Sequence, residues 1–207
     1  MSLRQKLGAA LYDAMMKKPE RAGLRSWRRE LLEHARGDVL EIGIGSGANL
    51  PHYPDEVGRL IAVDPNPEMI RRIDIDSFAG QGPVEIVEGY AHQLPLADDC
   101  VDTVVSTLVL CSVRDIAEAL AEIRRVMSPK GRFLFLEHVA SHKPKVRRWQ
   151  DRIDPLWHWC TGDCHMNRQT REAIEEAGFC FETLQREPMP KTPSLLRPAI
   201  RGVAVPC

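Results

Sequence analysis

One stretch decides the fold of this chain: Val39-Leu40-Glu41-Ile42-Gly43-Ile44-Gly45-Ser46-Gly47-Ala48-Asn49. An apolar run that contains an acid and leads into three alternating glycines predicts a buried strand that turns sharply into a helix. Glycine accepts positive φ angles and lets a ligand approach the backbone closely. The free N–H groups of the helix start, with Pro51 in its first turn, would favour a nucleotide-like ligand.

A second acid follows the next predicted strand. The apolar run that ends in Asp64 lies about twenty residues beyond the glycines, where a carboxylate can accept hydrogen bonds from both hydroxyls of a ribose. Capping of the next helix is the competing explanation. The glycines also satisfy a dinucleotide-binding pattern. Glu41, however, suits a cationic amino group better than a diphosphate, so we favour an adenosine-type ligand over a nicotinamide dinucleotide.

The composition is that of one globular domain. The chain has 207 residues, of which 43% are hydrophobic and 28% charged, with a formal net charge of -1. This near-neutral charge creates no field that would gather nucleic acid. No apolar run is long enough to span a membrane and no signal-peptide core is present, so we expect a soluble, cytoplasmic protein. Its six cysteines are expected to be reduced.

Predicted strands and helices alternate along most of the chain. Strands are expected at 38–42, 59–63, 84–88, 101–105 and 132–136, with helices near 67–78 and 114–127 and a turn at 129–131. Continuous apolar strands separated by helices predict an α/β fold with a parallel sheet covered on both faces. Ligands bind such sheets beyond the carboxyl ends of the strands.

The residues before the glycine stretch are expected to form two helices. Their apolar stripes are Leu3, Leu7, Leu11 and Ala14, then Leu24, Trp27, Leu31 and Leu32. Arg25, Arg28, Arg29 and Glu30 are expected on the solvated side. We therefore predict a helical unit at 1–36 that packs on, or closes as a lid over, a ligand-binding domain at 37–207.

The order of these motifs resembles the class I S-adenosylmethionine-dependent methyltransferases. The similar segments are Glu41–Gly47, Asp64, Gly89–Pro95, Asp98–Asp102 and Arg125–Arg132. The resemblance implies a Rossmann-like, seven-stranded, mostly parallel sheet with helices on both faces and an antiparallel last strand. The runs Cys180–Leu184 and Ile200–Val205 would supply strands six and seven. It also implies S-adenosyl-L-methionine as the cofactor.

The same resemblance implies the cofactor-binding residues. Gly43, Gly45 and Gly47 would make room for the methionine portion, Glu41 would support its amino group, and Asp64 would hold the ribose. Other strand-end residues are predicted to complete this site: Pro65, Asn66, Tyr90, Ala91 and Leu108. Tyr90 stands where the family usually carries an acid, so the backbone of Ala91 is the expected adenine contact.

Two branches of this family compete. The segments Tyr12–Met16 and Gly23–Arg28 resemble the quinone-biosynthesis C-methyltransferases. Those enzymes carry an Arg-Asn pair where this chain has Cys111 and Ser112, which disfavours a quinol acceptor. Other segments resemble the animal methyltransferase-like proteins that methylate small alkyl thiols. These segments are Thr107–Val113, Glu137–Ala140, Asp154–His158 and Cys164–Arg168. Their hydrophobic N-terminal anchor is absent here, so we do not expect membrane attachment.

A thiol acceptor must lose its proton before it attacks a methyl group. His138 follows strand five and is the first candidate for the base, because histidine titrates near neutrality; local packing is the alternative. Asp154 and His158 are further catalytic candidates in an aromatic segment predicted to line the acceptor pocket. The predicted acceptor contacts are Tyr12, Cys111, Trp157, Cys164 and Arg168. Arg168 would orient an anionic acceptor or pair with a carboxylate.

Other patterns carry less weight. Cys160, Cys164 and His165 lack the two close pairs typical of a zinc site, so no metal is expected. Convergence of Cys111, Cys160 and Cys164 would instead suit arsenite methylation. The basic run from Lys143 to Arg152 is typical of a solvated helix face, although weak contact with phospholipid headgroups or RNA is an alternative.

The sequence thus predicts a methyltransferase that acts on a small molecule, with an alkyl thiol as the first choice. The enzymatic alternatives are a quinol C-methyltransferase and a phospholipid-headgroup N-methyltransferase. A non-catalytic nucleotide-binding protein and a nicotinamide-dependent oxidoreductase represent a different class. The sequence does not determine the acceptor or the oligomeric state.

Overall fold

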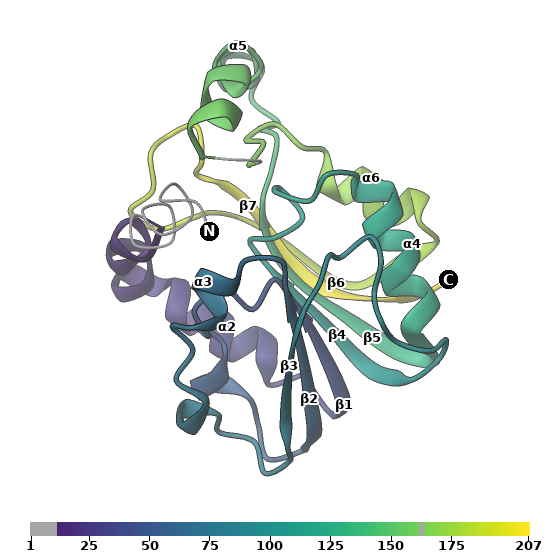
Figure 1. Cartoon of the computed structure of the whole chain (residues 1–207). Coiled ribbons are helices and arrows are strands. Elements are labelled where there is room, and N and C mark those ends of the chain that lie inside the picture. The colour runs from purple at the N-terminus through teal and green to yellow at the C-terminus, as the bar shows by residue number, and fades with distance from the viewer. Residues whose placement is uncertain (1–11, 162–163) are drawn as a thin grey trace.

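A single seven-stranded sheet forms the centre of the computed structural model, which describes residues 12–161 and 164–207 (Figure 1). The strands are β1 (Gly37–Ile42), β2 (Val57–Asp64), β3 (Val84–Glu88), β4 (Val101–Thr107), β5 (Met127–His138), β6 (Phe179–Pro188) and β7 (Pro198–Pro206). Their order is β3-β2-β1-β4-β5-β7-β6. The first five strands pair in parallel and β7 is antiparallel to both neighbours. The predicted Rossmann-like architecture is confirmed.

Helices cover both faces of this sheet. The helices of the described residues are a helix over residues 12–19, η1 (Glu20–Leu24), α2 (Arg25–Leu32), α3 (Pro67–Ile70), α4 (Ile116–Val126), α5 (Pro144–Thr161), which projects beyond the end of the sheet in Figure 1, and α6 (Thr170–Glu176). In Figure 1, α4 and α6 lie together on one side of the sheet and α2 lies on the other. Within the described ranges, none of these helices combines the length and the apolar character that crossing a membrane requires.

Each face of the sheet carries its own hydrophobic core. Alternate side chains of a strand point to opposite faces, and β5 shows this pattern clearly. Phe133 and Phe135 belong to the cluster that includes Ile123 of α4. Leu134 and Leu136 belong to the other cluster, which includes the α2 residues Leu31 and Leu32. Burial on both faces explains why the strands are continuous apolar runs.

Two predicted helices differ from the structure. Turns and the 3-10 helix η2 (Leu50–His52) follow the glycines instead of an α-helix, because Pro51 and Pro54 both lack the N–H that a continuing helix needs. The helix expected near 67–78 is reduced to α3 and the 3-10 helix η3 (Ile75–Ser77). Packing overrides helix propensity there, since Phe78 lies edge-on to Tyr53 with ring centroids 5.7 Å apart.

Smaller expectations have mixed outcomes. β5 begins at Met127, so the predicted turn at 129–131 lies within the strand, where its register with β4 shifts. Leu3, Leu7 and Leu11 lie outside the described residues. The division at residue 36 stays a prediction.

The expectation that all cysteines are reduced is wrong. Cys180 and Cys207 form a disulfide although 27 positions separate them in the sequence. Cys180 lies near the start of β6, Cys207 directly follows the last residue of the neighbouring β7, and their Cα atoms are 5.1 Å apart. Only the antiparallel pairing of these strands brings the two thiols within bonding reach.

Candidate active site

Two glycines of the loop after β1, Gly43 and Gly45, lack a side chain for different structural reasons. Gly43 and Gly45 both have positive φ angles, of 63° and 57°. A Cβ on Gly43 would lie 2.4 Å from a methyl carbon of Val109, so this glycine serves packing against the loop after β4. A Cβ on Gly45 would meet no atom within 4 Å. Gly45 therefore leaves open space where a ligand can approach the backbone.

Replacing Gly45 by Ala should weaken cofactor binding by roughly 10-fold or more, because the new methyl group enters this open space and the residue keeps an unfavourable φ. Gly178→Ala is the matched control: its φ is 82°, and its Cβ would also meet nothing within 4 Å. Both variants should lose similar stability, and only Gly45→Ala should bind the expected cofactor, S-adenosylmethionine, more weakly in calorimetry. Equal affinities of the two variants would contradict this role.

A cavity of about 390 Å³ lies between the glycine loop and the N-terminal helical residues. Tyr12, Asp13 and Met16 of the helix at 12–19 form part of its wall. The Ser46 hydroxyl donates a hydrogen bond of 2.9 Å to Asp13, and Arg72 pairs with the other carboxylate oxygen of Asp13 at 2.9 Å. These contacts hold the helix against the loop.

Glu41 is a buried acid in the wall of this cavity. Its carboxylate accepts hydrogen bonds from the Tyr53 hydroxyl at 2.6 Å and the Asn49 amide at 2.8 Å. Burial raises the pKa of Glu41 from 4.5 to about 7, although both hydrogen bonds and nearby Arg28 oppose the rise. An ammonium group in the cavity would favour the ionised carboxylate.

Glu41 should make the unliganded protein less stable as pH rises from 4.5 to 7. Across this window the folded protein binds the Glu41 proton more tightly than the unfolded chain, so the free energy of unfolding falls by roughly 3 kcal/mol. Glu41→Gln removes this contribution and leaves that of Asp64 in place. Urea unfolding at pH 5 and pH 7.5 should show a smaller decrease for the variant; identical decreases would contradict the raised pKa.

Arg28 is a cavity residue that the sequence analysis misplaced. We expected it on the solvated side of its helix, but it is only 3% exposed. Its guanidinium donates to Glu20 at 3.0 Å, Asn49 at 2.9 Å and Thr107 at 2.8 Å. Helix α2 presents the Arg28 side chain to the ends of β1 and β4. The guanidinium charge therefore lies between the carboxylates of Glu20 and Glu41. A single Arg within an Arg-rich helix carries no sequence signal for this.

Asp64 joins the ends of two neighbouring strands. One carboxylate oxygen accepts from the Gly45 amide and the other from the Asn66 amide, both at 2.8 Å. Burial raises the pKa of Asp64, and these two hydrogen bonds partly offset the rise. Each oxygen keeps a second lone pair for a ligand hydroxyl.

The remaining predicted cofactor residues lie around the same strand ends. Asn66 caps α3 by accepting from the Glu68 amide at 3.0 Å, and Pro65 is exposed. Tyr90 is 58% exposed and its ring lies beside that of His92. Ala91 is half-buried. Leu108 has a positive φ of 61° in the loop after β4, which is unusual for a branched side chain.

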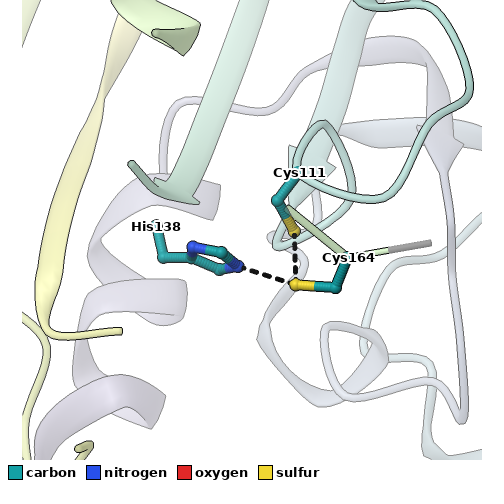
Figure 2. A group of neighbouring side chains, drawn as sticks. All are labelled: Cys111, His138 and Cys164. Atoms are coloured by element: carbon teal, nitrogen blue, oxygen red, sulfur yellow. Dashed lines mark hydrogen bonds between the residues drawn. The ribbon is translucent and has the colours of Figure 1, made fainter. Parts of the chain in front are cut away.

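Beyond β4 and β5, two thiols and an imidazole meet in a thiol–imidazole cluster formed by Cys111, His138 and Cys164 (Figure 2). Nε2 of His138 lies 3.2 Å from Sγ of Cys164, which lies 3.9 Å from Sγ of Cys111. All three ligand atoms lie within 4.8 Å of one another. The hydrogen bond with Cys111 and burial raise the pKa of the Cys164 thiol. The tertiary structure thus joins His138, predicted as a base, to two cysteines that were predicted as acceptor contacts.

Asp154 and His158 do not join this cluster. The carboxylate of Asp154 accepts from the Met166 amide and contacts Nδ1 of His165, both at 2.7 Å. The ring of His158 stacks on that of His165 at 4.3 Å between centroids. Asp154 therefore positions the segment that carries Cys164. Trp157, one position before His158, is half-buried.

The grouping of Cys160 with Cys111 and Cys164 is not assembled, and Arg168 lies beside a different cavity. Cys160 is exposed on α5, and the cluster contains His138 in its place, which contradicts the trio expected for arsenite. Arg168 donates to the Val113 carbonyl and lines a separate cavity of about 580 Å³. It is therefore placed away from the cavity beside the glycine loop.

Comparisons with known proteins agree with this architecture. Residues 40–135 match the family model described as "Methyltransferase domain". The human protein named thiol S-methyltransferase TMT1A is 38% identical over 172 residues, which cover 81% of this chain and 70% of that protein. The ubiquinone/menaquinone biosynthesis C-methyltransferase UbiE of Rubrivivax gelatinosus is 36% identical over 62% of this chain and 52% of its own length.

Among solved structures, a Thermotoga maritima protein described as an S-adenosylmethionine-dependent methyltransferase and possible histamine N-methyltransferase has the same fold. Its TM-score is 0.70, with 19% identity over 99% of this chain and 97% of that one. The order and direction of the strands are therefore those of a fold shared with that protein.

Proposed function

The chain belongs to the class I S-adenosylmethionine-dependent methyltransferases, and on this premise we propose that its methyl acceptor is a small alkyl thiol. The observation that carries the proposal is the thiol–imidazole cluster beyond β4 and β5. A site built from two sulfur atoms and an imidazole suits an acceptor that also reacts through sulfur. The similarity to a protein named thiol S-methyltransferase supports the same choice.

We further propose how the chain's own residues hold the cofactor. Glu41 accepts hydrogen bonds from its ammonium group, Asp64 accepts from its ribose hydroxyls, and Gly45 lets it approach the backbone. When bound, S-adenosylmethionine supplies a methyl group made electrophilic by the attached sulfonium. The helix at 12–19 closes the cavity, because Tyr12 and Met16 form part of its wall. Exclusion of water in this way favours a reaction that neutralises charge.

The acceptor thiol is held beyond the end of β4. Thr107, the last residue of β4, lines the cofactor cavity, and Cys111 follows in the next loop. Tyr12 and Arg28 line the same cavity as Thr107, so the N-terminal helical residues face the end of β4. Holding thiol and methyl group side by side supplies much of the catalysis in such displacements, up to roughly 7–11 kcal/mol in well-oriented systems.

An acceptor panel tests this function directly. The full chain is incubated with S-adenosylmethionine and alkyl thiols, demethyl-quinols or phospholipids with amino headgroups, and release of S-adenosylhomocysteine is measured. We expect turnover with thiols at least 10-fold above that with the other classes. Turnover with a quinol or a phospholipid, and none with thiols, would show that the proposed thiol acceptor is wrong.

A further inference from the structure

We propose that the thiol–imidazole cluster of Cys111, His138 and Cys164 binds a zinc ion, and that the open fourth position of this ion takes the acceptor's sulfur. The inference rests on the proposed thiol methylation and adds a metal to it. The first argument is the donor set: two sulfurs and one imidazole nitrogen converge within 4.8 Å. Cysteine and histidine are the ligands that zinc prefers, and three protein ligands with one open position are typical of catalytic zinc.

The spacing of the donor atoms suits a tetrahedral ion. Zn–S bonds of about 2.3 Å and Zn–N bonds of about 2.0 Å place tetrahedral sulfur ligands about 3.8 Å apart, and sulfur and nitrogen about 3.5 Å apart. The observed separations are 3.9 Å between the two Sγ atoms and 3.2 Å between Cys164 Sγ and His138 Nε2. These two separations need adjustments of a few tenths of an ångström, and the third pair, Cys111 Sγ and His138 Nε2, lies within 4.8 Å and would draw together around the ion.

The ligands come from separate, well-braced segments. His138 is the last residue of β5, and Cys111 lies in the buried loop after β4. The segment after Cys164 is fixed by Asp154, which accepts from the Met166 amide at 2.7 Å. Gln150, which is fully buried, also donates to the Met166 carbonyl at 2.8 Å. Such outer contacts orient metal ligands.

His138 presents one nitrogen to the sulfurs and keeps the other apart. Nε2 faces Cys164, as Figure 2 shows, while Nδ1 is buried without a hydrogen-bond partner among the described residues. With the proton on Nδ1, the Nε2 lone pair is free to coordinate an ion bound beside Cys164. His138 is then a metal ligand, in place of the base predicted from the sequence.

The bound ion would replace a general base in activating the acceptor. The acceptor's S–H bond breaks, its proton goes to water, and the sulfur lone pair forms the bond to zinc. A thiol that coordinates a metal is deprotonated at neutral pH. Three thiolates around one divalent ion leave a net charge of −1, which keeps the acceptor sulfur nucleophilic.

Metal binding by the full chain is the test. The reduced, chelator-treated protein is titrated with zinc in a calorimeter, and we expect one tight site per chain. Cys111→Ser, His138→Ala and Cys164→Ser should each weaken binding at least 100-fold, because the loss of an outer contact already costs about 10- to 100-fold. Cys160→Ser is the control, since this exposed thiol lies outside the cluster. An absent site, or one insensitive to Cys164→Ser, would overturn the inference.

A second experiment uses Co²⁺ in place of zinc and measures the absorption spectrum, so it needs neither a variant nor an activity assay. Co²⁺ in the cluster should show thiolate-to-metal charge-transfer absorption and the visible bands of a tetrahedral ion. Addition of an alkyl thiol should shift those visible bands as the fourth ligand changes. Visible bands that do not change when the thiol is added would overturn the inference. So would a Cys111–Cys164 disulfide that resists the reductant and prevents metal binding.

Two outcomes separate this inference from the proposed function. Thiol methylation at full rate by the metal-free protein would overturn the zinc inference and leave the thiol acceptor standing. A cobalt spectrum that responds to thiols, in a protein that methylates only quinols, would overturn the proposed acceptor and leave the metal site standing.

Discussion

Replacement of Arg28 by Met should lower the free energy of unfolding by about 3–5 kcal/mol, because it breaks a buried ion pair and leaves its partners behind. The guanidinium is bonded to Glu20, Asn49 and Thr107, and its side chain is 4% exposed. Without it, Glu20 loses its partner and the buried Glu41 loses the nearby positive charge that favours its ionised form. Methionine keeps much of the side-chain volume, so the loss reports mainly on charge and hydrogen bonding.

Arg29→Met is the matched control, since Arg29 is exposed on the same helix. It should change stability by less than about 0.5 kcal/mol. Urea unfolding followed by circular dichroism measures both variants. A loss for Arg28→Met no larger than that of the control would show that the buried network contributes little, and would remove Arg28 as the link between helix α2 and the cavity.

Replacement of Asp64 by Ala should weaken S-adenosylmethionine binding by roughly 10- to 100-fold. A hydrogen bond to a charged group contributes about 1.5–3 kcal/mol, and each 1.4 kcal/mol corresponds to a factor of ten in affinity. The variant loses the acceptor that we propose for the ribose hydroxyls. It also releases the Gly45 amide, which Asp64 holds at 2.8 Å, so the glycine loop is less well ordered for the ligand.

Calorimetric titration with S-adenosylmethionine gives the affinity, and the thermal midpoint shows whether the variant is folded. Glu85→Ala serves as the control, because this acid lies on neighbouring β3 and pairs with Arg59 on the surface. The control should bind the cofactor as the unmodified protein does. Unchanged affinity in a folded Asp64→Ala protein would remove Asp64 from the cofactor site.

The sequence by itself determined the order of strands and helices and therefore the fold. Apolar strands buried on both faces, separated by amphipathic helices, leave few arrangements other than a doubly wound sheet. The bounds of β1 to β4 were therefore predictable within two residues, while β5 begins five residues before its predicted start. The glycine stretch and Asp64 were equally visible, because a close backbone approach and a strand-end acid leave local sequence signals. These features depend on neighbours along the chain.

Only the tertiary structure decided which residues meet across the chain. Cys111, His138 and Cys164 were each predicted near the acceptor, yet nothing in their spacing showed that their ligand atoms lie within 4.8 Å of one another. Arg28 was assigned to solvent because its helix was considered without the sheet that covers one side of it. The disulfide of Cys180 and Cys207 likewise depends on how β6 pairs with β7. Contacts between distant segments follow from packing and register, which a one-dimensional pattern does not encode.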